Sequence, residues 1–142
     1  MNPQVHLTIT TDAARIDIDV AWTLLRGTHW ARDMSRETLA RAIDNSLCFA
    51  LLRGDALVGL ARVVTDRATF AYLTDVVIAP SERGKGLGHR LIDEIVRHPD
   101  LQGLRRFALL TSDAMKLYAD FGFTVGSGTS TYMERRDDER SL

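Results

Sequence analysis

A glycine-rich turn between an apolar segment and an amphipathic segment carries the clearest chemistry in this sequence. Three glycines alternate with other residues over 84–88, directly after the apolar run 76–79. Glycine lets the backbone approach an anion closely, and the first turn of a following helix supplies unpaired N–H groups and the positive end of its dipole. Arg83 and Lys85 add positive charge. The turn therefore predicts a pyrophosphate-binding site.

The spacing of these glycines excludes two common nucleotide sites. A P-loop needs a glycine, four further residues and then Gly-Lys followed by Ser or Thr, whereas Gly88 is followed by His89 and Arg90. A dinucleotide fingerprint needs Gly-x-Gly-x-x-Gly early in the chain, whereas these glycines read Gly-x-Gly-x-Gly past its middle. The turn therefore favours a different phosphate ligand.

Two motifs resemble landmarks of the GNAT family of N-acetyltransferases. Arg-x-x-Gly-x-Gly over 83–88 is similar to the family's coenzyme A signature, and Leu-Tyr-Ala-Asp-Phe-Gly-Phe over 117–123 is similar to its Leu-Tyr-x-x-x-Gly-Phe motif. The resemblance extends from about residue 47 to residue 123. It implies a mixed α/β fold, with a mostly antiparallel sheet of about seven strands flanked by about four helices. In that fold the strand before the glycine turn diverges from its neighbour and leaves a cleft for coenzyme A.

The resemblance also implies a reaction. An acetyl group would pass from acetyl-CoA to a primary amine of a small molecule or protein, by direct attack in a ternary complex. The cofactor would contact the main chain of Val76 and Ile78, and also Phe121, with the Val76 N–H stabilising the oxyanion. Tyr118 would donate a proton to the departing thiolate. The expected pyrophosphate-binding residues are Arg83, Gly84, Lys85, Gly86, Leu87 and Gly88.

The general base is left open by the sequence. Attack needs a neutral amine, so a carboxylate, an imidazole or a water chain must accept a proton. Many GNAT proteins carry a glutamate four residues before the position of Val76, but Tyr72 stands there, which favours a water relay. Asp75 lies in an apolar run, so we expect it to pair with Arg62 or Arg67, and a structural role is as well supported as a functional one.

The acceptor pocket is expected where two N-terminal helices cover the sheet. We expect Trp22 to belong to the core rather than to this pocket. The resemblance also leads us to expect an asparagine seven residues before Tyr118, where the sequence has Thr111. Thr111 or Ser112 could serve the cofactor or cap the next helix. The candidate acceptor-binding residues are His29, Trp30, Tyr72 and Asp75, with Asp33 as a further candidate.

Hydrophobic periodicity predicts the elements that position these residues. Glycine at the break 54–55 predicts a hairpin, and Gly122 is expected to end the last helix. The range 70–78 is too apolar on both faces for an edge strand, so it is expected in the middle of the sheet. Strands are predicted over 5–11, 47–53, 56–65, 70–78, 105–110, 123–125 and 129–133, and helices over 17–25, 35–46, 86–97 and 113–121.

Length and composition favour one small domain. The chain has 142 residues, 45% of them hydrophobic and 26% charged, which predicts a single domain over 1–142 with a flexible tail from about Glu134. The formal net charge of -1 disfavours a nucleic-acid partner bound through bulk charge. No apolar run of about 18 residues predicts a membrane span. One cysteine excludes an internal disulfide, and the cytoplasm is the expected location.

Neither a covalent intermediate nor a metal is expected. Cys48 lies between apolar residues of a predicted strand, which favours a buried neutral thiol. The four histidines are scattered without ligand spacing. Two other functions stay open, a non-catalytic acyl-CoA sensor and an interaction module that keeps only the fold. A homodimer through the closing strands stays open as well.

Overall fold

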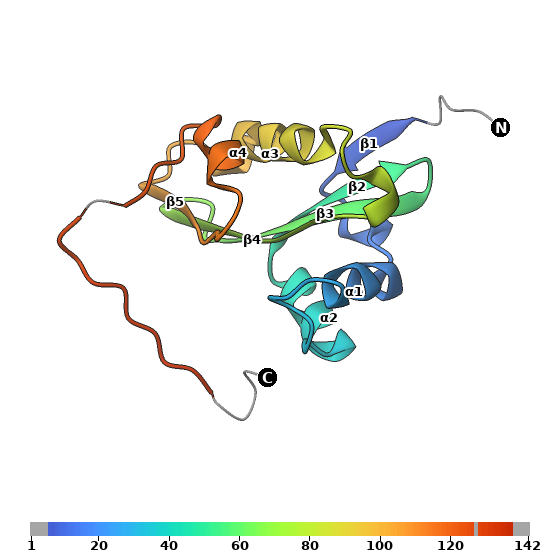
Figure 1. Cartoon of the computed structure of the whole chain (residues 1–142), viewed down its shortest axis with the longest axis horizontal. Helices are drawn as coiled ribbons and strands as arrows, with labels where there is room; N and C mark the ends of the chain where they lie inside the picture. Colours follow the sequence, from blue (N-terminus) through green and yellow to red (C-terminus); the bar gives the residue numbers. More distant parts are fainter. Residues whose placement is uncertain (1–5, 127, 138–142) are drawn as a thin grey trace.

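The computed structural model describes residues 6–126 and 128–137, which contain a five-stranded mixed sheet with helices on both faces (Figure 1). The sheet order is β1-β2-β3-β4-β5, and neighbours are antiparallel except for the parallel pair β4 and β5. The strands are β1 (Leu7–Thr10), β2 (Leu47–Arg53), β3 (Ala56–Thr65), β4 (Phe70–Ile78) and β5 (Arg106–Leu109). The helices are α1 (Ile18–Arg26), α2 (Arg36–Asp44), α3 (Leu87–Arg97) and α4 (Met115–Ala119).

The first two helices begin where the sequence predicts because polar side chains cap them. The Asp17 carboxylate accepts the N–H groups of Asp19 and Val20 at 3.0 and 3.3 Å. The Ser35 hydroxyl accepts the N–H of Thr38 at 3.1 Å. Each cap satisfies amides that have no partner inside the helix. These caps fix the starts of the two helices that cover one face of the sheet.

The sheet separates two apolar cores. Figure 1 places α1 and α2 on one face and α3 and α4 on the other. Strand β2 alternates between them, because successive side chains of a strand point to opposite faces. The α1–α2 core includes Ala21, Leu25, Leu39, Ile43, Cys48, Ala50, Leu52, Leu60 and Val77. The α3–α4 core includes Leu47, Phe49, Val63, Ala71, Leu73, Leu91, Ile92, Ile95 and Tyr118.

Strand β4 changes character halfway along. Its register with β5 ends at Leu73, although the strand itself continues. Its register with β3 skips Asp75 and Val76, and Asp75 has a φ of 53°, in the left-handed region. An extra residue of this kind forms a β-bulge and reverses the faces reached by the side chains beyond it. Leu73 and Val77 accordingly lie in opposite cores, and the second half of β4 diverges from β5.

The prediction of two closing strands is wrong. In the described part of 123–137, which lacks residue 127, the structure has neither helix nor strand, so the described sheet has five strands instead of about seven. Figure 1 shows this segment running away from β5. A strand needs a neighbour that takes its N–H and C=O groups, so the β propensity around Tyr132 is not sufficient alone. Residues 138–142 of the predicted tail lie outside the described residues.

Two predicted boundaries also differ. The first strand begins at Leu7, and the predicted residues before His6 lie outside the described part of the chain. The last helix has five residues, and the Thr111 hydroxyl accepts the N–H of Ala114 at 3.0 Å in the turn that precedes it. Gly122 follows with a φ of 89°, which an L side chain rarely adopts, and ends the helix as predicted.

Candidate functional site

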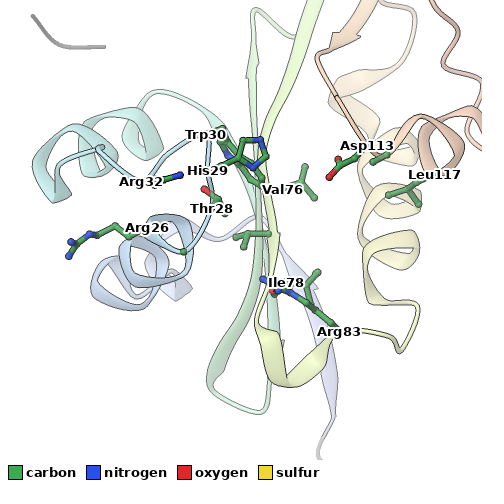
Figure 2. Close-up of a pocket in the computed structure, with 13 residues that line it drawn as sticks. Arg26, Thr28, His29, Trp30, Arg32, Val76, Ile78, Arg83, Asp113 and Leu117 are labelled. Carbon is green, nitrogen blue, oxygen red and sulfur yellow. The ribbon is translucent and has the colours of Figure 1, made fainter. Parts of the chain in front are cut away.

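A cleft of about 930 Å³ opens where β4 diverges from β5 (Figure 2). The loop after α1 forms one wall, the second half of β4 forms the floor, and the residues around the start of α4 form the opposite wall. The lining residues are Arg26, Gly27, Thr28, His29, Trp30, Arg32, Val76, Val77, Ile78, Arg83, Asp113, Ala114 and Leu117. The cleft therefore brings together five predicted site residues, namely His29, Trp30, Val76, Ile78 and Arg83.

The glycine-rich turn lies beyond the floor of the cleft and leads into α3. Gly84 and Gly86 both have a φ of 76°, and Gly86 is the N-cap of α3 with no side-chain cap. The first N–H groups of a helix have no intrahelical partner. A Cβ added at Gly84, Gly86 or Gly88 would meet no heavy atom of the described residues within 4 Å. The turn therefore offers the positive end of α3 to open space, as a phosphate site requires.

A buried carboxylate that the sequence analysis missed holds this turn. Glu82 is 7% exposed, and its carboxylate accepts N–H bonds from Arg53 at 2.8 and 2.9 Å and from Lys85 at 3.3 Å. The hydrogen bonds from Arg53, aided by Lys85, lower the pKa of Glu82 to about 2 against the opposing effect of burial. Arg83 donates from Nε to the Ile78 carbonyl at 3.1 Å. The partner Arg53 is 29 positions away in sequence, so no local pattern indicated it.

The floor of the cleft is formed by strand residues that carry no reactive side chain. Val76 lies in the bulge and has no partner in the registers of β4 with β3 or with β5. Val76 and Ile78 are half-buried and line the cleft. The structure thus combines a strand edge that β5 no longer pairs with a helix start at one end, which suits an elongated ligand that carries a phosphate group.

Two aromatic rings stand on the wall after α1. The Trp30 indole N–H donates to Asp75 Oδ1 at 3.3 Å, and Arg62 Nε donates to Asp75 Oδ2 at 2.8 Å. The His29 ring lies edge-on to Trp30, with centroids 5.3 Å apart and planes at 89°. The expected pairing of Asp75 is therefore with Arg62, while Arg67 pairs with Asp100.

Tyr118 is placed behind the cleft rather than among its lining residues. Its side chain is in the α3–α4 core, with its ring 5.9 Å from that of Phe123. Burial, with a smaller effect of the Asp113 charge, raises the pKa of Tyr118, so the phenol keeps its proton at neutral pH. Figure 2 shows the Asp113 carboxylate, which the sequence analysis did not single out, directed into the cleft. The catalytic role of Tyr118 stays a prediction.

Other predicted site residues are not among those that line the cleft. The buried side chain of Leu87 begins α3, and the Phe121 ring packs on His89 at 4.5 Å between centroids. Tyr72 and Asp33 are also outside the lining. Trp22 packs against the α1–α2 core, as expected, and its indole donates to the Met34 carbonyl at 2.8 Å.

Cys48 has the surroundings of an inert thiol. It is buried, and burial raises its pKa to about 12. Among the residues that the structure describes, no three His, Cys, Asp or Glu side chains are placed to hold a metal ion. No helix in the described ranges has the length and apolar composition needed to cross a membrane.

Comparison with known proteins identifies the family. A profile of the acetyltransferase (GNAT) family matches residues 17–123. FG08082 of Gibberella zeae, named as an acetyltransferase, is 35% identical over 133 residues, which span 78% of this chain and 74% of that protein. A crystal structure assigned to the GNAT acetyltransferases, from Xanthomonas campestris pv. campestris, is 47% identical with a TM-score of 0.87, over 93% of this chain and 94% of that chain. The chain belongs to the GNAT acetyltransferase family.

A more distant structure shares the fold. N-acetylglutamate synthase from Neisseria gonorrhoeae, solved with coenzyme A and N-acetyl-glutamate, has a TM-score of 0.69 at 23% identity, over 87% of this chain and 30% of that chain. The predicted mixed α/β fold class and the predicted family are thus confirmed. As a GNAT acetyltransferase the protein uses acetyl-CoA as the acetyl donor.

Proposed function

We propose that this protein transfers the acetyl group of acetyl-CoA to a primary amine in a ternary complex, without a covalent acyl-enzyme. The observation that carries the proposal is the open glycine turn at the start of α3, next to a strand whose register with β5 has ended, so that its edge on that side is unpaired. The cleft volume of about 930 Å³ falls in the range of small-ligand sites. The residues present therefore fit coenzyme A.

Each part of the site has a proposed task in binding. Main-chain amides of 84–88 would hold the pyrophosphate, and Arg83 would neutralise it, with Lys85 shared between Glu82 and the ligand. The main chain of Val76 and Ile78 would pair with the pantetheine arm as an added strand. The two tasks explain why the turn needs glycine, whereas the floor needs only a strand edge that β5 leaves unpaired.

Acetyl-CoA supplies an acetyl group activated as a thioester. The Val76 N–H would donate to the carbonyl oxygen as it gains negative charge. As the C–N bond forms and the C–S bond breaks, the Tyr118 hydroxyl, which its raised pKa keeps protonated at neutral pH, would give its proton to sulfur and regain one from water. The proton lost by the amine would pass to water in the cleft, since both Asp75 oxygens already accept hydrogen bonds.

One observation favours a second candidate function. Tyr118 does not line the cleft, whereas its neighbour Leu117 does. An acyl-CoA sensor would keep the binding turn without an acid at the sulfur. Such a protein would bind acetyl-CoA and show no turnover with any primary amine, whereas the proposed enzyme would release coenzyme A when an amine is added.

The binding proposal is tested with two glycine variants. Gly88→Val places a side chain in open space where φ is outside the left-handed region, so it fills the space proposed for the ligand without backbone strain. We expect coenzyme A affinity, measured by calorimetry, to fall at least about tenfold, which is about 1.4 kcal/mol. Thermal unfolding should stay close to that of the wild type. Gly126→Val is the control, because its Cβ also meets nothing within 4 Å but lies far along the chain from the turn.

Equal coenzyme A affinity in wild type and Gly88→Val would contradict the proposed seat of the pyrophosphate. An absence of binding heat in the wild type would contradict the function itself. A cytoplasmic location, a homodimer, metal-free catalysis and the lack of nucleic-acid or membrane partners stay predictions. Cell fractionation, sedimentation, activity after chelation and binding assays would check them in turn.

A further inference from the structure

Trp30 is a large apolar side chain left in the open beside the cleft. Half of it is exposed, at 50%, although burial of an indole would normally be favourable. It lines the same cleft as Val76, where the thioester is proposed to lie. An exposed ring at this position is available to a ligand that enters from the acceptor side.

The ring is held by a buried ionic network rather than by surface packing. Its N–H donates to Asp75, which is 4% exposed and stands in the bulge of β4. Arg62 on β3 donates to the other Asp75 oxygen at 2.8 Å and to the Ser46 hydroxyl at 3.2 Å. Ser46 in turn donates to the Ala42 carbonyl of α2 at 2.6 Å. The indole is therefore tied to both the sheet and α2, so little freedom remains to be lost when a ligand binds.

His29 completes the recognition surface. Its ring stands perpendicular to Trp30, at 89°, and both rings line the cleft, so the two form an aromatic corner. Aromatic groups prefer offset-stacked and edge-to-face contacts, and a flat ligand placed in such a corner makes one contact of each kind. From the far wall Asp113 directs a carboxylate into the cleft, where an ammonium group gains from negative charge (Figure 2).

We propose that the aromatic corner of His29 and Trp30 selects acceptors whose primary amine is joined to an aromatic ring by a short alkyl chain, and that Asp75 is the positioning residue that fixes Trp30. This inference rests on the proposed function, because it names the acceptor class of the same cleft. The aromatic part lies in the corner and the amine reaches toward Val76. Asp75 acts through the indole and not as a proton acceptor.

The test compares two amines that differ in the flat group, phenethylamine and n-butylamine. Wild-type protein saturated with coenzyme A is titrated with each by calorimetry. We expect phenethylamine to bind roughly two- to tenfold more tightly, as one added aromatic contact predicts. In Trp22→Phe, where Trp30 is the only tryptophan left, phenethylamine should change the indole emission in a saturable way.

The anchor is tested with Trp30→Phe, which keeps a ring and removes the N–H bond to Asp75. Because a ring without its anchor is no longer held in the corner, we expect phenethylamine affinity to fall by up to roughly tenfold, the contribution of one aromatic contact, and coenzyme A affinity to stay within about twofold. Trp22→Phe is the matched control, since it also removes an indole hydrogen bond but lies outside the cleft lining. It should leave phenethylamine affinity unchanged.

The outcomes separate the two proposals. Equal affinity for the two amines, or unchanged phenethylamine affinity in Trp30→Phe, overturns the inference. The proposed function is unaffected by either result as long as coenzyme A still binds. If coenzyme A does not bind to the wild type, the proposed function fails and the inference fails with it. Tighter binding of phenethylamine that is lost in Trp30→Phe and kept in Trp22→Phe supports the aromatic corner.

Discussion

The two halves of β4 lie in one continuous strand and contribute to the protein in different ways. The first half pairs with β3 on one side and β5 on the other, and Leu73 is 3% exposed within the α3–α4 core. The second half has lost β5, contains the bulge at Asp75 and lines the cleft. One inserted residue thus separates a structural segment from a binding segment. The difference shows that a ligand surface can be made by interrupting a strand without ending it.

The difference in packing between the two halves of β4 is tested most strongly by truncating one side chain in each half. Leu73→Ala removes a fully packed side chain, and we expect it to lower the free energy of unfolding by about 2–5 kcal/mol. Val76→Ala should cost clearly less, because Val76 is half-buried. Denaturant titration measures both losses. Equal losses would show that the two halves do not differ in packing.

The cleft beside the second half of β4 can support catalysis only if a proton donor reaches the departing thiolate there. Tyr118→Phe should reduce turnover by about 100-fold or more, as expected for a lost general acid, with acetyl-CoA affinity nearly unchanged. Because the pKa of Tyr118 is raised, its proton is lost only as pH rises above its ordinary value of 10. Loss of this proton should therefore cause no decline in turnover at any pH below 10. Wild-type turnover in the variant would remove the proposed role of Tyr118.

The turn that follows the second half should respond to acid. The pKa of Glu82 falls from 4.5 to about 2 on folding, so its ion pair stabilises the protein above about pH 4.5 and is lost as pH falls toward 2. Wild type should unfold at a higher temperature than Glu82→Gln at pH 6, and this difference should shrink between pH 4.5 and 2. A difference that stays constant over that range would contradict the assignment. This is the smallest of the expected effects.

Local sequence patterns were enough to predict most elements. Helix α2 follows its Ser35 cap, and the hairpin between β2 and β3 turns at Gly54, whose φ is 60°. The glycine turn was predicted from its three glycines and the segments that flank them. The structure shows left-handed φ values at Gly84 and Gly86, which restrict those positions to glycine in practice. In each case the cause and the structure lie within a few residues of each other.

Features that depend on distant partners could not be predicted in this way. An arginine partner for Asp75 was predicted, as Arg62 or Arg67, but nothing local to Asp75 shows that Trp30 takes its other oxygen or that the strand bulges there. The role of Glu82 likewise depends on its hydrogen bonds with Arg53, which lies on another element far away in sequence. The closing strands were predicted from β propensity at Tyr132 and its neighbours, yet propensity cannot supply the missing neighbour strand.

The burial of Cys48 has a practical consequence for labelling experiments. Because burial raises its pKa to about 12, the thiol stays protonated at neutral pH, and we expect maleimides and mild oxidants not to react with it. It is also the sole cysteine of the sequence. A thiol introduced on the surface would thus carry a dye or spin label at one site without removal of the native residue, and the purified protein should need no reducing agent in storage.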